Sequence, residues 1–216
     1  MNEYEMVIKQ YEEYLTSNKK TAINRISNFI CKKYSGQELL QFGAYLLESQ
    51  ISESMQIITM CIKKDELAYN LDYINYYYTW IYKYVNSWGT CDLLCYRVIN
   101  PMIEKFPSLY FNIKKWANNS NPFIRRLSAV SLIHSSQAFS IEVPFSLVIE
   151  VIDELKYDTN YYVKKGIGWL LKYSYLSYRK ETIEYILNNK EVLPNTVITY
   201  ALQKMTNKDK YLIKGI

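Results

Sequence analysis

The feature that most constrains the fold is a twelve-residue pattern that occurs twice, 39 residues apart. The first copy runs from Asn121 to Leu132, and the second runs from Asn160 to Leu171. Each copy begins with Asn, continues with two apolar or aromatic residues and a β-branched residue, and then has a basic pair. A small residue follows three positions after the pair, and the end is apolar. Because Asn commonly caps helix N-termini, the pattern predicts the same helix start in two repeated units.

A helical unit that recurs at this period is typical of HEAT-like repeats. Such repeats stack into a curved solenoid, and equivalent helices of successive repeats form its concave wall. The basic pairs, Arg125-Arg126 and Lys164-Lys165, would then lie along one concave groove. Since adjacent residues of a helix point about 100° apart, at most one residue of each pair can face the groove directly.

Helical periodicity covers nearly the whole chain and predicts an all-α fold in a single domain, residues 1–216. Asn121 followed by Pro122 predicts one helix start, and Pro107, Pro144 and Pro194 suit others. Only residues 73–78 are ambiguous between helix and strand. We expect helices near residues 2–16, 20–34, 37–48, 52–64, 66–85, 88–104, 107–117, 122–136, 144–155, 160–176, 179–189 and 195–205.

Composition and the chain start indicate a soluble cytoplasmic protein. The chain is 49% apolar and 22% charged, which is ordinary for a globular protein and unlike a disordered one. Residues 1–15 carry four glutamates, unlike a secretory signal, and no apolar run approaches the roughly 20 residues that span a bilayer. The four cysteines, which include Cys91 and Cys95, are therefore expected to be reduced and structural, without a metal site.

The positive charge of the chain is concentrated in its second half. Residues 1–106 hold 11 Lys and Arg against 12 Asp and Glu, whereas residues 107–216 hold 15 against 9. A one-sided basic field favours a polyanionic partner, either nucleic acid or an anionic membrane. Membrane binding is disfavoured because the basic residues do not gather on one strongly amphipathic helix.

Residues 85–94 form the second informative stretch. Asn86 or Ser87 can cap a helix, and Trp88 and Asp92 would then be four residues apart on one face of it. A carboxylate beside an indole can act on a cation. The alternative is structural: the tryptophans, Trp169 included, would pack in the core, Asp92 would complement the helix dipole, and the basic pairs would be solvated.

Three segments together resemble the AlkD-type DNA alkylation repair proteins, which are HEAT-like repeat DNA glycosylases. The resemblance covers about residues 36–205, and its segments are Ser87-Trp88-x-x-x-Asp92, Asn121-Pro122-Phe123-Ile124-Arg125-Arg126 and Val163-Lys164-Lys165-Gly166-Ile167-Gly168-Trp169. By resemblance, Asp92 matches the catalytic aspartate, Trp88 and Trp169 match the active-site tryptophans, and Arg126 matches the essential arginine.

The resemblance implies hydrolysis of the N-glycosidic bond of a cationic N3- or N7-alkylated purine in double-stranded DNA. Asp92 would stabilise the positive charge that develops on the deoxyribose, and Arg126 would hold a flanking phosphate. The tryptophan rings would face the cation, no cofactor would be needed, and a monomer would suffice. Two alternatives stay open: a non-catalytic HEAT-repeat protein that recognises bent, branched or damaged DNA, and a protein-interaction scaffold.

Overall fold

The computed structural model describes residues 3–15, 18–49, 51–136 and 138–215. Helices account for nearly all of its regular structure, which confirms the predicted all-α fold. The elements in chain order are α1 (Glu3–Tyr14), α2 (Lys19–Lys33), α3 (Gly36–Glu48), α4 (Ser54–Ile62), η1 (Glu66–Ala68), η2 (Leu71–Tyr73), α5 (Ile74–Tyr84), α6 (Trp88–Leu94), η3 (Cys95–Ile99), α7 (Asn100–Lys105), η4 (Pro107–Leu109), α8 (Tyr110–Ala117), α9 (Pro122–Val130), β1 (His134–Ser135), β2 (Phe139–Ser140), α10 (Phe145–Leu155), α11 (Tyr161–Ser177), α12 (Arg179–Asn188), α13 (Asn195–Ala201), η5 (Leu202–Lys204) and α14 (Asn207–Lys214).

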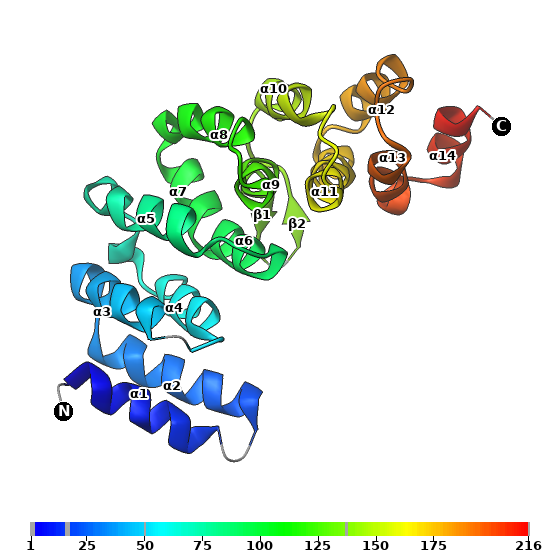
Figure 1. Ribbon diagram of the computed structural model, residues 1–216. Coiled ribbons are helices and arrows are strands. Elements are labelled where there is room, and N and C mark those ends of the chain that lie inside the picture. The colour runs from blue at the N-terminus through cyan, green and yellow to red at the C-terminus, as the bar shows by residue number, and fades with distance from the viewer. Residues whose placement is uncertain (1–2, 16–17, 50, 137, 216) are drawn as a thin grey trace.

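The helices form two layers along an arc (Figure 1). Helices α2, α4, α6, α9, α11 and α13 form one layer, in which each helix packs against the next. Helices α1, α3, α5, α8, α10 and α12 form the second layer, along the outer side of the arc (Figure 1). One cluster of buried apolar residues extends between the layers from Val7 to Ile213. This is the predicted helical-repeat architecture, and it places α6, α9 and α11 side by side.

Two predicted helices differ from the observed ones. The helix expected over residues 66–85 is divided into η1, η2 and α5, because the Asp65 and Asn70 side chains each accept a backbone hydrogen bond and start separate turns. Residues 73–78 are therefore not a strand. The helix expected over 122–136 ends at Val130, and a short antiparallel hairpin of β1 and β2 follows. Sequence periodicity also missed α14.

The predicted helix over residues 88–104 is continuous but contains a π-helical segment, η3. Pro101 explains this segment. Proline has no N–H and its ring clashes with the carbonyl four residues before it, here that of Arg97. The widened turn releases this carbonyl, which accepts a hydrogen bond from the Tyr69 hydroxyl instead. The helix thus accommodates Pro101 in the π-helical turn that follows α6.

Helix α14 is fixed to the end of the arc by one carboxylate. Asp209 accepts hydrogen bonds from the Tyr175 hydroxyl at 2.6 Å and from Arg179 Nη2 at 2.9 Å. The Thr206 side chain caps the same helix. The hydrogen bond from Tyr175, with smaller contributions from Thr206 and Arg179, lowers the pKa of Asp209 below its ordinary value. In the described ranges, no helix combines the length and apolar character needed to cross a membrane.

Candidate functional site

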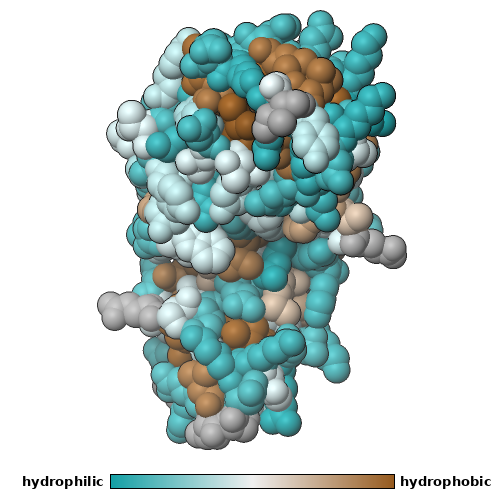
Figure 2. All heavy atoms as spheres, turned by 90° about the vertical axis from the view of Figure 1, so that its right-hand side faces the viewer, coloured by the Kyte–Doolittle hydropathy of each residue, from teal (hydrophilic) through white to brown (hydrophobic). Residues whose placement is uncertain are grey.

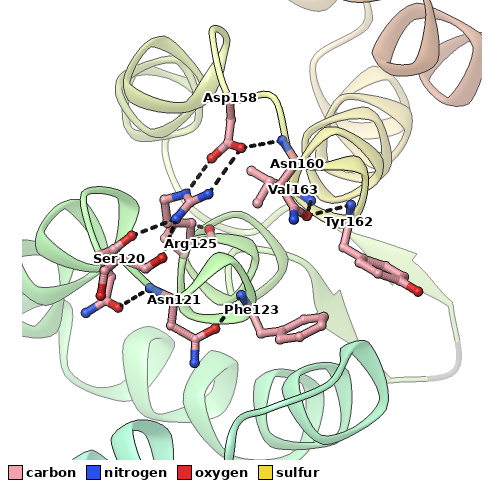
Figure 3. Close-up of polar contacts among 10 residues, drawn as sticks. Ser120, Asn121, Phe123, Arg125, Asp158, Asn160, Tyr162 and Val163 are labelled. Atoms are coloured by element: carbon pink, nitrogen blue, oxygen red, sulfur yellow. Dashed lines mark hydrogen bonds and ion pairs between the residues drawn. The ribbon is translucent and has the colours of Figure 1, made fainter.

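Helices α9 and α11 begin with the same hydrogen-bonded cap, as the repeated sequence pattern predicts (Figure 3). The side chains of Asn121 and Asn160 each accept a hydrogen bond from the backbone N–H two residues later, at 2.9 Å in both cases. The backbone N–H of each cap is held in turn by a side chain two residues earlier, Asn119 and Asp158, at 2.8 Å. The two basic pairs therefore lie at equivalent turns of neighbouring helices.

Arg125 connects the two repeats (Figure 3). Its Nε and Nη2 atoms donate to the carboxylate of Asp158, in the loop before α11. Its Nη1 atom donates to the backbone carbonyls of Asn119 and Ser120 at 2.8 and 2.9 Å. All three guanidinium nitrogens of Arg125 thus bind the protein itself. The equivalent residue of the second pair, Lys164, is half-buried and has no carboxylate partner within the described ranges.

Arg126 points in another direction and binds Asp92 of α6. Its Nε and Nη2 atoms donate to the two carboxylate oxygens of Asp92 at 2.9 and 2.8 Å, and its Nη1 atom donates to the carbonyl of Tyr162 at 2.8 Å. Both partners are almost inaccessible, with 5% of Arg126 and 7% of Asp92 exposed. Burial alone would lower the pKa of Arg126, but the hydrogen bonds and charge of Asp92 raise it above its ordinary value.

The N-terminal cap of α6 places Trp88 and Asp92. Ser87 is the cap: its hydroxyl accepts a hydrogen bond from the backbone N–H of Thr90, whose hydroxyl accepts one from the Ser87 N–H. Trp88 and Asp92 therefore lie one turn apart, as the spacing predicts. Trp88 is 57% exposed and so is not a core residue, whereas Asp92 is buried.

Two glycines of α11, Gly166 and Gly168, lie where neighbouring helices approach α11 closely. A Cβ at Gly166 would lie 3.3 Å from Cγ of Arg126, so the glycine allows Arg126 to lie flat against α11. A Cβ at Gly168 would lie only 2.6 Å from Cβ of Tyr200. The two small residues thus bring α9 and α13 close to opposite sides of α11, around the face that carries Trp169.

Trp169 is half-buried in the wall behind the ion pair. Arg126 Cζ lies 5.7 Å from the centre of its ring, and Lys172 Nζ lies 5.4 Å from it. The ring also meets Tyr96 edge to face at 5.6 Å, and it contacts Phe139 of the hairpin. Trp169 is therefore both a packing residue and a cation-binding surface, so the two interpretations of the sequence are not exclusive.

These side chains surround one cavity of about 470 Å³ on the inner layer. Figure 2 looks at this open side of the arc and shows a hollow beside a group of residues of intermediate hydropathy. The structure brings together Trp88, Asp92, Arg126 and Trp169, with Lys165, but not Arg125 or Lys164. The described residues that line the cavity are Trp88, Asp92, Arg126, Tyr161, Tyr162, Lys165, Trp169, Lys172 and Tyr200.

Four of the lining residues were not singled out from the sequence. Lys172 could have been found, because it follows Lys165 and Trp169 at helical spacing and so shares their face. Tyr161 and Tyr162 belong to the repeated pattern, but the chain has 23 tyrosines, so a tyrosine by itself does not indicate a functional site. Tyr200 comes from α13, and only the tertiary fold brings it to the cavity.

Among the described residues, no cysteine or histidine lines the cavity. No group of three or more His, Cys, Asp or Glu side chains that could hold a metal ion gathers anywhere in the described ranges. Cys91 of α6 and Cys95 of η3 are buried, with their sulfur atoms 4.0 Å apart. Cys31 lies elsewhere, on α2, and is only half-buried. A hydrogen bond from Cys61 lowers the pKa of Cys31 to about 7, with burial opposing this effect.

Comparison with known proteins identifies the family. A family model described as "DNA alkylation repair enzyme" matches residues 3–205, nearly the whole chain. The chain belongs to this family. Its membership supports a role in DNA repair, with DNA as substrate or partner.

Among solved structures, the chain is similar to smu.31 from Streptococcus mutans UA159. The TM-score is 0.65 at 16% sequence identity, and the similarity covers 94% of this chain and 99% of that one. At this identity the likeness shows a shared fold. No curated protein matches the chain.

Proposed function

We propose that this member of the DNA alkylation repair family is a DNA glycosylase that releases cationic N3- and N7-alkylated purines from duplex DNA. The observation that supports this most is the placement of Asp92. Its carboxylate lies at the wall of an aromatic cavity, buried, and held by both of its oxygens. A negative charge that is held in place before the reaction is what a positively charged transition state requires.

The reaction would move charge from the base to the sugar. When the N-glycosidic bond breaks, its electron pair leaves with the alkylated purine and neutralises it, and positive charge develops at C1′ of the deoxyribose. Asp92 would stabilise this charge and orient the water that adds to C1′, while the proton of that water leaves to solvent. Trp88 and Trp169 would offer their ring faces to the cation. A good leaving group needs no protonation, and so no further acid is required.

Arg126 would act first on Asp92. Each carboxylate oxygen accepts one hydrogen bond from Arg126, so each retains a lone-pair direction for water or for the sugar. The ion pair fixes the orientation of the carboxylate and favours its ionised form. The second N–H groups on Nη1 and Nη2 remain available, and we assign them to a DNA phosphate that flanks the target nucleotide.

The ion pair also supports a second candidate, a DNA-binding protein without catalysis. With Arg126 bound to both oxygens of Asp92, the net charge of the pair is zero, and a distant sugar cation would be stabilised only weakly. The cavity and its lysines would still hold distorted DNA. In both cases affinity should fall steeply with salt, because phosphate neutralisation releases counterions. A protein-interaction scaffold would show no DNA affinity at all.

The test is the release of free N7-methylguanine and N3-methyladenine from methylated duplex DNA. We expect release by the wild type and a loss of about a hundredfold or more in Asp92→Asn, the scale of removing one electrostatic stabiliser. Asp72→Asn, at an exposed position outside the cavity, is the matched control and should retain full activity. Circular dichroism and duplex affinity check that Asp92→Asn remains folded.

Three outcomes distinguish the candidates. Undiminished release by Asp92→Asn would refute the assignment of Asp92. Duplex binding without base release by either protein would favour the non-catalytic candidate. A flat response of affinity to salt would contradict both.

A further inference from the structure

The side of the cavity formed by α11 contains a lysine held between two tyrosines. Lys165 Nζ lies 4.8 Å from the centre of the Tyr161 ring and 5.2 Å from that of Tyr200. Interaction with Tyr200 raises the pKa of Lys165, burial partly opposes this, and Tyr161 adds a smaller increase. Unlike most surface lysines, Lys165 therefore has a defined position.

Lys172 extends the same wall. It lies two turns further along α11, and its Nζ atom is 4.8 Å from the centre of the Tyr173 ring and 3.2 Å from Oε1 of Gln203. The two lysines differ from the arginines of the neighbouring α9 in one decisive respect. Arg125 and Arg126 are each neutralised by an aspartate, whereas Lys165 and Lys172 have no carboxylate partner within the described ranges.

The charge of the cavity is thus divided between its two sides. The α6 and α9 side contains the Asp92–Arg126 pair, whose charges cancel, and the α11 and α13 side contains two uncompensated ammonium groups. Aromatic rings flank both ammonium groups and hold them in place, so an anion in the cavity would meet two positive charges. Ammonium donors beside tyrosine side chains suit a phosphate oxygen, because a phosphate accepts several hydrogen bonds and carries a full negative charge.

We propose that Lys165, positioned by Tyr161 and Tyr200 and supported by Lys172, forms a binding site for one phosphodiester of the DNA strand whose target nucleotide faces Asp92. This inference rests on the proposed binding of DNA in the cavity, but not on catalysis. Lys165 would be a positioning residue. By holding one phosphate at the cavity of about 470 Å³, it would determine which nucleotide faces the carboxylate of Asp92. A lysine that is already ordered loses less side-chain entropy on binding than a free one.

The experiment is a double-mutant cycle between the protein and single phosphates of the DNA. One phosphate at a time around an N7-methylguanine is replaced by a neutral methylphosphonate, and the affinity of each duplex is measured for the wild type and for Lys165→Met. For the wild type, we expect neutralisation of the phosphate that Lys165 binds to weaken binding by about tenfold, the scale of a charge-assisted hydrogen bond, separately from any effect at the phosphate assigned to Arg126. For Lys165→Met, the same replacement should have almost no effect.

Two further variants test the arrangement. Lys115→Met removes an exposed lysine from α8, in the other layer of the fold, and should leave the tenfold effect of the neutral phosphate unchanged. Tyr200→Phe retains the ring but removes the hydroxyl, and it should reduce the effect to about threefold.

An equal methylphosphonate effect in wild type and Lys165→Met at every position would overturn the proposed phosphate site while leaving DNA binding intact. Absence of any DNA binding by the wild type would refute the proposed function and this site together.

Discussion

A methyl group added to α11 at Gly168 should destabilise the protein, although alanine favours helices. A Cβ at this position would lie 2.6 Å from Cβ of Tyr200 and 2.8 Å from the carbonyl oxygen of Val197, whereas ordinary contacts begin at 3.4 Å. Neither atom can move by rotation of a side chain, so α13 itself must shift. Overpacking of this kind costs about 1–3 kcal/mol. Because the helix propensity of alanine offsets about 1 kcal/mol of this cost, we expect Gly168→Ala to lower the free energy of unfolding by up to about 2 kcal/mol.

Urea unfolding followed by circular dichroism measures this change, and Gly89→Ala is the matched control. A Cβ at Gly89 would meet only the Ser87 hydroxyl, at 3.9 Å, so the same substitution there should stabilise the protein by about 0.5–1 kcal/mol. Because Tyr200 lines the cavity, Gly168→Ala should also weaken binding to duplex DNA. If Gly168→Ala were as stable as Gly89→Ala, the close approach of α11 and α13 would be wrong.

Three further predictions concern charges and thiols. Arg126→Met should lower the free energy of unfolding by about 3–5 kcal/mol because it leaves Asp92 buried without a partner, and addition of Asp92→Asn should recover part of this loss in urea unfolding. The hydrogen bonds that lower the pKa of Asp209 stabilise the fold. This stability is fully present above the pKa of 3.8 that Asp209 has in the unfolded chain, and it is lost as the pH falls through the lower pKa of the folded state. Asp209→Asn should therefore flatten this part of the acid unfolding curve. The rate at which Cys31 reacts with iodoacetamide should rise with pH, with a midpoint near its pKa of about 7. Cys31→Ser should show no fast-reacting thiol. Slow alkylation of the wild type at pH 8 would contradict this prediction.

The repeated pattern predicted the fold because its signals are local. Asn121 and Asn160 cap their helices through their own side chains, so residue type and spacing suffice to predict the helix starts. The hairpin of β1 and β2 depends on tertiary contacts. Pro101 is a local cause of the π-helical segment, but the partner of the carbonyl that this segment frees is set by the tertiary fold. Arg97, for example, releases its carbonyl to the distant hydroxyl of Tyr69, and no local pattern indicates such a partner.

The sequence predicted which residues form the core of the candidate site, but not which residues they bind. Spacing placed Trp88 and Asp92 on one face, and resemblance added Arg126 and Trp169. Helical geometry allowed only one residue of each basic pair to face the groove, and in the structure Arg126 is the one that lines the cavity. That Arg125 instead connects two repeats through Asp158 follows from the stacking of the helices, which the sequence of one helix does not contain.

The charges of the cavity imply where selectivity for alkylated bases arises. Asp92, Arg126, Lys165 and Lys172 together carry a net positive charge, which attracts phosphates but repels a cationic purine. This charge argues against attraction to the lesion as the source of selectivity. We assign selectivity to bond cleavage, in which an alkylated purine leaves readily and an ordinary purine does not. We expect undamaged and methylated duplexes of one sequence to bind within about threefold of each other, with base release from the methylated duplex alone. Fluorescence anisotropy with matched duplexes measures this ratio, and a preference of a hundredfold for methylated DNA would show that the cavity recognises the lesion before any bond breaks.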